Sequence, residues 1–342
     1  MRREGNLWER VFEPENLELA FSKALRGKRG KADAQEFAAR REENLDRLAE
    51  ELSAGTVVVG VGHQFTIYDP KQRLITAPCF RERVLHHAIM NVCEPVFERT
   101  LITDTFACRR GKGRIAALLR ARQFAAGHAC FLKLDVRKYF DSVSHDVLLG
   151  KLARLFKEVP LLELFRRIIE GYAPTPGRGL PIGSLTSQHF ANFYLGELDR
   201  FVKQDLCVRG YARYMDDFAL WEDASGRLTS CLAQVTDFLG DELQLTPKPP
   251  CYVQRTCQGM DWLGCRVYPS HMTLNRRSRR RFVRKLRAYE AMFAAGQMDE
   301  RELQRRVESL VAFTRTQGVS SWQFRRSVLE SRSRRADADL DP

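Results

Sequence analysis

The chain has 342 residues, of which 44% are hydrophobic and 29% charged, so it is long enough for two or three domains or for one enzyme built from subdomains. This composition excludes a disordered protein, and the lack of any apolar run near about 18 residues argues against a membrane span. The 56 Lys and Arg residues outnumber the 43 Asp and Glu residues, and the formal net charge of +13 indicates a polyanionic partner such as nucleic acid.

Helical and strand patterns alternate along the chain. In the first region, for example, Leu17, Phe21 and Leu25 recur at helical spacing. In chain order the predicted elements are helices within 7–52, strands at 56–61 and 64–68, a helix at 80–97, a strand at 130–136, helices at about 144–157 and 160–171, a helix from about 187, two strands within 211–221, a helix at about 226–243, a strand pair within 262–268, and a basic helix at 276–293. Helices mixed with short antiparallel strands predict an α+β fold.

The N-terminus leads into no apolar core of the signal-peptide type. The nine cysteines include no Cys-x-x-Cys pair and no matched His or Cys pair, which argues against a zinc site and fits a reducing compartment. We therefore expect a cytoplasmic protein that has no membrane segment.

One segment concentrates the positive charge. Residues 276–287 contain eight basic residues and no acid, while Phe282 and Leu286 begin an apolar stripe on the same predicted helix. One face of this helix is therefore expected to pack, and the other to bind a phosphate backbone. A solvated face that binds nothing is the open alternative.

Three aspartates form the strongest chemical signal. Asp135 ends a predicted strand, and Asp216 and Asp217 lie at the predicted turn of a hairpin. Nucleotidyl transfer with two Mg²⁺ ions about 4 Å apart needs carboxylates that converge on one point. Turns also favour Asp for local hydrogen bonding. Here, however, the pair lies inside an apolar hairpin, where two acids would repel each other and lose hydration unless a cation compensates.

The motif at 214–217 (YMDD) resembles the central motif of reverse transcriptases, and residues 131–140 (FLKLDVRKYF) resemble their first palm motif. The resemblance implies a right-hand polymerase with fingers, palm and thumb, whose antiparallel palm sheet is flanked by helices. It also implies two Mg²⁺ ions, for which Mn²⁺ can substitute. Asp135 and Asp216 would each bind both ions. The Val136 carbonyl would bind one ion, and Asp217 would support the other two aspartates.

The resemblance covers most of the chain. Residues 68–84 and 106–111 are similar to fingers motifs of the family, and 262–265 (WLGC) to its primer grip. The residues implied to contact the nucleotide are Lys71, Arg73, Phe140, Ile182, Gly183, Gln188 and Lys248. Those implied to contact primer and template are Trp262, Leu263, Gly264, Arg277, Arg280, Arg281, Arg284 and Lys285.

Some of these residues have specific implied roles. Phe140 matches a bulky side chain beneath the incoming sugar, which would clash with a ribose 2′-hydroxyl and select deoxynucleotides; simple core packing is its alternative. Lys248 matches a lysine that protonates the leaving pyrophosphate. Lys71 and Arg73 match charges that grip the triphosphate, although as isolated residues such charges are more often solvated.

The implied domains follow the chain. Residues 1–130 would form an N-terminal helical region and fingers, and 131–268 the palm, with a fingers insertion at about 146–180. Residues 269–332 would form a helical thumb, and 333–342 a tail.

The segment at 180–188 (LPIGSLTSQ) stands where most of the family has Gln-Gly-x-x-x-Ser-Pro. Gly183 would let the backbone approach the nascent pair, and Ser187 is expected to cap the following helix. Ile182 and Gln188 depart from the usual Gln and Pro, and this pattern is similar to the enzymes of diversity-generating retroelements. Those enzymes copy an RNA template into cDNA with frequent errors at template adenines. The short stretch after the thumb, with no room for a ribonuclease H, maturase or endonuclease domain, fits the same type.

The resemblance also implies partners: a template RNA, the RNA–cDNA hybrid, dNTPs and a basic oligomeric accessory protein, for which residues 7–52 are the expected docking region. Four alternatives stay open. They are a group II intron-like reverse transcriptase, an antiphage-defence reverse transcriptase, an RNA-dependent RNA polymerase, and a non-catalytic RNA-binding scaffold on the polymerase fold.

Overall fold

The computed structural model describes residues 3–68, 72–315, 318–328 and 330, and its described strands form three sheets. A two-stranded sheet has the order β1-β2, and two four-stranded sheets have the orders β4-β5-β3-β6 and β10-β9-β8-β7. The strands are β1 (Gly62–Ile67), β2 (Arg73–Pro78), β3 (Cys130–Asp135), β4 (Gly210–Tyr214), β5 (Asp217–Glu222), β6 (Val253–Arg255), β7 (Met260–Trp262), β8 (Cys265–Val267), β9 (Met272–Leu274) and β10 (Val319–Ser320).

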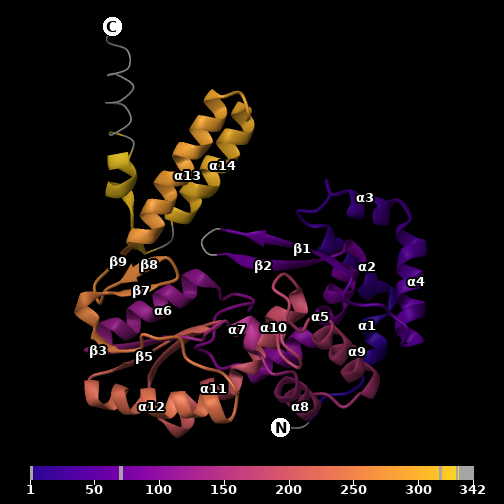
Figure 1. Cartoon of the computed structure of the whole chain (residues 1–342), viewed down its shortest axis with the longest axis horizontal. Helices are drawn as coiled ribbons and strands as arrows, with labels where there is room; N and C mark the ends of the chain where they lie inside the picture. Colours follow the sequence, from indigo (N-terminus) through magenta and orange to yellow (C-terminus); the bar gives the residue numbers. More distant parts are fainter. Residues whose placement is uncertain (1–2, 69–71, 316–317, 329, 331–342) are drawn as a thin grey trace.

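Helices surround these sheets. Figure 1 shows α1–α4 at one end of the molecule and the α13–α14 pair rising at the other, with the four-stranded sheets between that pair and α12. The helices are α1 (Trp8–Val11), α2 (Pro14–Leu25), α3 (Ala32–Ala39), α4 (Arg41–Ser53), α5 (Phe80–Thr100), α6 (Arg114–Gly127), α7 (Tyr139–Ser142), α8 (His145–Leu155), α9 (Val159–Glu170), α10 (Leu185–Tyr194), α11 (Gly196–Arg200), α12 (Ser225–Asp241), α13 (Arg276–Ala294) and α14 (Glu300–Thr314). A π-helical turn at Phe201–Asp205 extends α11, and a 3₁₀ turn lies at Thr256–Gln258.

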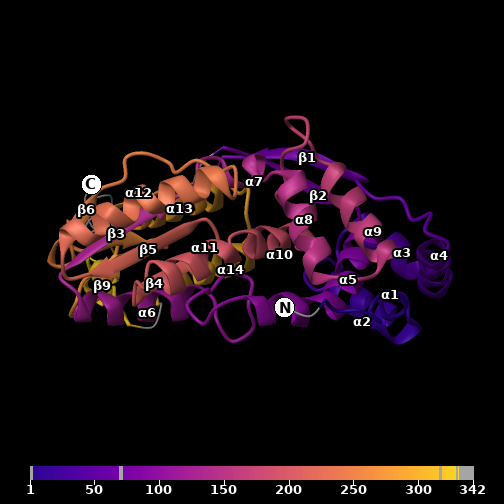
Figure 2. The ribbon, with the colours of Figure 1, turned by 90° about the horizontal axis from the view of Figure 1, so that it is seen from below.

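The two-residue period of β3 divides the central sheet into two faces. Leu132 and Leu134 belong to the core that includes the buried residues of α12, whereas Phe131 belongs to a second core with α6 and β7–β9. Figure 2 shows α12 and α6 on opposite sides of these strands. Lys133 and Asp135 share the face of Phe131 but are only half-buried. The sheet therefore presents a carboxylate where its second face opens.

The predicted α+β class with an antiparallel sheet flanked by helices is confirmed, because β3, β4, β5 and β6 all pair antiparallel. Among the described residues, no helix combines the length and the apolarity that crossing a bilayer requires. The predicted tail at 333–342 lies outside the described residues.

Two local predictions are wrong. Residues 56–61 form no strand, because the amides of Gly60 and Val61 donate to the Glu82 carboxylate instead of to a neighbouring strand. Ser187 does not cap the helix at 185–194, which begins earlier with Ser184 in the N-cap position. The predictions also omitted β2, β6, β9, β10, α6, α7 and α14.

Candidate active site

Asp135 and Asp217 face each other on neighbouring strands. Asp135 ends β3 and pairs with Asp217, the first residue of β5, which also pairs with Tyr214 of β4. The turn therefore consists of Met215 and Asp216, one residue earlier than the prediction on Asp216-Asp217. Met215 has a φ of +59°, an uncommon conformation for a residue other than glycine, and such backbone strain is typical of functional sites.

The carboxyl groups at this turn are hard to ionise. Burial, and then the charge of Asp135 within hydrogen-bonding reach, raise the pKa of Asp216 to about 6. Burial raises the pKa of Asp217 to about 7, with Lys133 opposing the rise and Asp135 adding to it. Lys133 Nζ lies 3.4 Å from Asp217 Oδ1, close enough for an ion pair, but this buried oxygen makes no aligned hydrogen bond. Burial and mutual repulsion therefore both disfavour the ionised forms of these aspartates.

The carboxyl groups fit a divalent cation. Two acids that repel each other in a half-buried place become favourable when a cation binds between them. Mg²⁺ needs only one or two protein carboxylates, because waters and phosphate oxygens complete its coordination. Asp135 and Asp216 would supply that pair. In the described part of the chain no group of three or more His, Cys, Asp or Glu side chains is placed to hold a metal ion, so two carboxylates would need substrate and water as the other ligands.

The segment after α12 runs beside the end of β3. The Lys248 amide donates to the Asp135 carbonyl at 2.8 Å, and the Arg137 amide donates to the Thr246 carbonyl at 2.9 Å. Neither bond uses the Val136 carbonyl, the implied metal ligand. Lys248 Nζ also lies 3.2 Å from Asp135 Oδ2. Main chain and side chain thus both hold Lys248 beside the carboxylates.

The β1–β2 hairpin brings Arg73 near the carboxylates and contacts the turn at 182–183. Arg73 begins β2, and its charge opposes the rise in the pKa of Asp216, so the two side chains are electrostatic neighbours. The Thr76 amide donates to the Ile182 carbonyl at 2.8 Å. Gly183 has a φ of +126°, and a Cβ there would lie 2.6 Å from the Thr76 carbonyl oxygen, so only glycine fits. The implied nucleotide residue Lys71 lies outside the described residues.

Two implied nucleotide residues make contacts with the protein itself. Phe140 is half-buried against the main core, with its ring 5.7 Å from that of Tyr139 in an edge-to-face arrangement. Gln188 Oε1 accepts a hydrogen bond from Cys108 Sγ at 3.5 Å, in a pocket of about 390 Å³ between α2, α5, α10 and the loop before α6. The roles implied for both residues stay predictions.

The implied primer-grip residues form the turn between β7 and β8. Trp262 is 1% exposed and packs in the core, so its ring is not open to a primer. Leu263 and Gly264 have φ angles of +46° and +83°, and Arg114 Nε donates to the Leu263 carbonyl at 3.0 Å. Trp262 would therefore act by supporting this turn.

The basic residues of α13 divide between packing and exposure. Phe282 and Leu286 are buried, as their spacing predicts, while Arg281 is half-buried with its guanidinium 5.3 Å from the centre of the Phe313 ring. Lys285 is also half-buried. The exposed implied residues are Arg277, Arg280 and Arg284.

A buried ion pair that the sequence did not predict supports the turn of Met215 and Asp216. Arg213 and Asp199 are fully buried, with Nε–Oδ1 and Nη2–Oδ2 distances of 2.6 Å. Arg213 Nη1 also donates to the Met215 carbonyl at 3.0 Å, and the Tyr211 hydroxyl donates to Asp199 at 2.7 Å. This pair fixes the turn that carries Asp216. An arginine within an otherwise apolar strand was the available signal.

Removal of divalent cations should make stability fall as pH rises. Because the pKa values of Asp216 and Asp217 are about 6 and about 7 in the folded chain, it binds more protons than the unfolded chain between about pH 4 and pH 7. Asp216 alone, whose pKa rises from 3.8 to about 6, should therefore lower the free energy of unfolding by about 3 kcal/mol across the lower part of this window. The free energy of unfolding is measured with urea at each pH for the wild type and for Asp216→Asn, and the difference between the two values reports the contribution of Asp216. A difference that rises with pH would contradict the assigned pKa direction.

The comparisons with known proteins concern the segment that carries this site. The family described as "Reverse transcriptase (RNA-dependent DNA polymerase)" matches residues 68–267. A putative COX1/OXI3 intron 1 protein of Saccharomyces cerevisiae is 23% identical over 168 residues, covering 46% of this chain and 20% of that protein. The group II intron-encoded protein LtrA of Lactococcus lactis is 24% identical over 172 residues, covering 48% and 29%. The chain thus spans less than a third of either relative.

Telomerase from Candida tropicalis is similar in fold, with a TM-score of 0.48 and 10% identity over 78% of this chain and 57% of that one. The fold of this chain is that of a right-hand polymerase. Since the family match covers more than half of the chain and includes β3, β4 and β5 with their aspartates, the chain belongs to the reverse transcriptase (RNA-dependent DNA polymerase) family.

Proposed function

We propose that this chain is an RNA-directed DNA polymerase that makes cDNA by two-magnesium nucleotidyl transfer. The observation that carries the proposal is the meeting of Asp135 and Asp216 at the turn between β4 and β5, where burial and mutual repulsion favour a cation. Mg²⁺ bound there would neutralise the triphosphate and activate the primer hydroxyl. Asp217, beside Lys133, would support this pair from β5.

Other residues of the chain would bind and orient the nucleotide. Arg73, near the carboxylates, would hold the triphosphate, and Lys71 is proposed for the same role. Lys248, tied to the end of β3, would give a proton to the leaving pyrophosphate. Phe140 would exclude the 2′-hydroxyl of a ribonucleotide.

The nucleic acid would lie between the hairpin and the basic helix. The exposed cations of α13 would bind the phosphate backbone, and the turn at 263–264 would hold the primer. In this proposal residues 1–130 are the N-terminal region and fingers, 131–268 the palm with a fingers insertion at about 146–180, and 269–332 the thumb.

We further propose that the enzyme makes error-prone cDNA for a diversity-generating retroelement. Ile182 and Gln188 support this type, because they replace the Gln and Pro that most of the family carries. The Ile182 carbonyl accepts a hydrogen bond from the Thr76 amide of β2. The apolar side chain of Ile182 offers no hydrogen bond that could favour a correct base pair over a mismatch. The matches to intron-encoded proteins favour a group II intron-like reverse transcriptase as the second candidate.

The N-terminal helices are the proposed docking region for a basic accessory protein in the cytoplasm. In a chain of net charge +13, the exposed side of α4 carries four acids against two arginines, Arg41 and Arg47, which pair with two of those acids. A basic partner would find complementary charge there. The exposed acids of α4 are Glu42, Glu43, Asp46 and Glu50.

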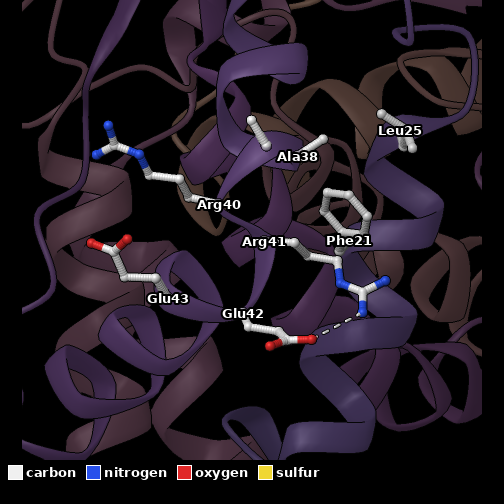
Figure 3. A pocket seen from close by; sticks show the side chains of 8 residues that line it. Phe21, Leu25, Ala38, Arg40, Arg41, Glu42 and Glu43 are labelled. Carbon is white, nitrogen blue, oxygen red and sulfur yellow. Dashed lines mark ion pairs between the residues drawn. The ribbon is translucent and has the colours of Figure 1, made fainter.

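A hollow adjoins this acidic side. Figure 3 shows Phe21 and Leu25 of α2 and Ala38 of α3 around a pocket of about 550 Å³ that continues to the start of α4, where Arg41 and Glu42 form an ion pair at 3.8 Å. The pocket joins apolar surface to charged surface, as an anchoring site for a protein partner would.

One experiment tests the proposed function. The chain is given a primed RNA template, Mg²⁺ and either dNTPs or NTPs, and the product is sequenced. We expect template-dependent DNA with errors concentrated opposite adenine. RNA products would indicate an RNA polymerase, accurate DNA an intron-like enzyme, untemplated DNA a defence enzyme, and RNA binding without synthesis a scaffold.

Ile182→Gln should lower misincorporation opposite template adenine by about tenfold, because the new amide can hydrogen-bond near the nascent pair and reward correct geometry. Product sequencing beside the wild type measures the change. Ile182→Leu, which keeps an apolar side chain, is the matched control and should leave the error spectrum unchanged. Equal error rates opposite adenine for the Gln variant and the wild type would rule out this role for Ile182.

A further inference from the structure

A buried polar network joins α5 to the turn at 182–183. His86 of α5 is 2% exposed. Its Nδ1 lies 3.1 Å from Thr186 Oγ1, its Nε2 lies 3.3 Å from Ser184 Oγ, and the two hydroxyl oxygens are 2.9 Å apart. Ser184 holds the N-cap position of α10, but its side chain makes no capping bond. Its hydroxyl contacts the histidine instead.

The same histidine reaches the hairpin through Glu82. His86 Nε2 lies 3.4 Å from Glu82 Oε1, and the Glu82 carboxylate accepts the amides of Gly60 and Val61 at 3.0 and 2.7 Å, just before β1. Burial opposes ionisation of Glu82, but the hydrogen bond from His86 and the two amides outweigh it, and the pKa of Glu82 lies below its ordinary value. Glu82 is therefore an ionised acceptor.

These partners assign a direction to the network. A carboxylate can only accept, so His86 Nε2 carries the proton and faces Glu82 and the Ser184 oxygen. Nδ1 then accepts from the Thr186 hydroxyl, whose oxygen accepts from the Ser184 hydroxyl. With these directions every member of the network has a partner, and the tautomer of His86 follows from the hydrogen bonds around it.

The turn at 182–183 is tied to β2 on its other side. Thr76 donates its amide to the Ile182 carbonyl, and Gly183 approaches Thr76 too closely for any side chain. Arg73 lies three residues earlier on the same strand, about 10 Å away along an extended chain. Its charge acts on Asp216. A displacement of β2 against the turn at 182–183 would therefore move the Arg73 side chain relative to the Asp216 carboxylate.

We propose that His86 is a positioning residue that holds the β1–β2 hairpin against the turn at 182–183, and so places Arg73 and Gly183 to bind the triphosphate of the incoming nucleotide. The inference rests on the proposed polymerase function. His86 is buried and contacts protein groups, so it acts through the two elements that it joins. Removal of its ring would leave Glu82 and two hydroxyls without their shared partner, which is costly in a buried place.

Variants of the network test this role. His86→Leu and Thr186→Val should each raise the KM for dNTP by about tenfold, with kcat changed less than about threefold, because nucleotide binding is weakened while the carboxylates are intact. RNA affinity should not change. His86→Gln, which can donate to Glu82 and accept from Thr186, should restore most of the lost affinity for dNTP.

Thr100→Val is the matched control. Thr100 is buried at the end of α5 and donates to the Phe97 carbonyl at 2.7 Å, so the variant loses a comparable hydroxyl outside the network. Its KM for dNTP should stay at the wild-type value. An equal rise in KM for the Thr100 and Thr186 variants would show general destabilisation and overturn the proposal.

Hydrogen exchange separates this inference from the proposed function. The amide of Thr76 should exchange about tenfold faster in Thr186→Val than in the wild type, whether or not the chain makes DNA. A wild type that makes no DNA would refute the polymerase function. Unchanged exchange at Thr76 together with an unchanged KM in an active Thr186 variant would refute the role of His86 alone.

Discussion

Asp216→Asn should lower DNA synthesis by about a thousandfold or more, while RNA affinity stays within about twofold of the wild type. The substitution keeps the shape of the side chain but removes one of the two charges that meet at the turn, and a divalent cation would lose a ligand. In the proposed function RNA binding depends on the cations of α13, which the substitution does not touch. Primer extension and RNA affinity are measured on the same preparations.

The removed charge should also affect stability. Because burial and Asp135 disfavour the ionised form of Asp216, the asparagine variant should be more stable than the metal-free wild type at about pH 8. Lost activity in a better-folded protein would exclude unfolding as the cause.

Asp223→Asn is the matched control for the active-site variant. Asp223 follows the other end of β5, and its side chain is 75% exposed. Like Asp216, Asp223 is one residue outside β5, and the substitution again removes one carboxylate charge. Asp223 lies at the end of β5 that is far from Asp135. It should keep wild-type activity. Full activity of Asp216→Asn, or equal loss in both variants, would refute the proposed metal site.

Asp199→Ala should destabilise the chain by about 3–5 kcal/mol, because it leaves the Arg213 guanidinium buried without its counter-ion. Both side chains are fully buried, and Asp199 also accepts the hydroxyls of Tyr211 and Thr105 at 2.7 and 2.8 Å. Urea unfolding measures the loss. The variant should also lose activity at temperatures where it is folded, since Arg213 holds the Met215 carbonyl of the turn.

An exposed ion pair provides the comparison. Glu43 and Arg47 of α4 are 2.7 Å apart, but their side chains are more than half exposed. Glu43→Ala should therefore cost less than about 1 kcal/mol. If Asp199→Ala cost no more than Glu43→Ala, the buried pair would not be what holds the turn in place.

The double variant Asp199→Leu with Arg213→Met separates charge from packing. Removing both charges leaves no uncompensated ion, so this variant should recover much of the stability lost in Asp199→Ala. Activity should stay low, because a methionine cannot donate to the Met215 carbonyl. Recovery of full activity would show that the turn needs no hydrogen bond from Arg213.

Local patterns predicted the elements that carry the site. The alternation of residues 130–136 predicted β3 with a carboxylate at its end, and the apolar run on both sides of YMDD predicted the hairpin of β4 and β5. Each of these patterns involves neighbours in sequence, whose side chains alternate between two faces whatever the rest of the chain does. The exact turn was missed by one residue, because the pairing of Tyr214 with Asp217 depends on strand register.

Elements whose burial comes from distant partners were missed. The helix α6 buries Ala117, Ala121 and Ala125 against strands about 100 residues away, and small side chains give little contrast between its faces. The strand β2 pairs antiparallel with β1 but is exposed at its start, so it has no clear alternation.

The sequence by itself determined the three aspartates, the strand and hairpin that carry them, and the basic helix, because composition and short-range period express these features directly. Only the tertiary structure decided that Lys133 is the partner of Asp217, that Arg213 and Asp199 hold the turn, and that His86 ties the hairpin to Gly183. These contacts join side chains from separate elements, and which of them meet depends on register and packing across the whole chain.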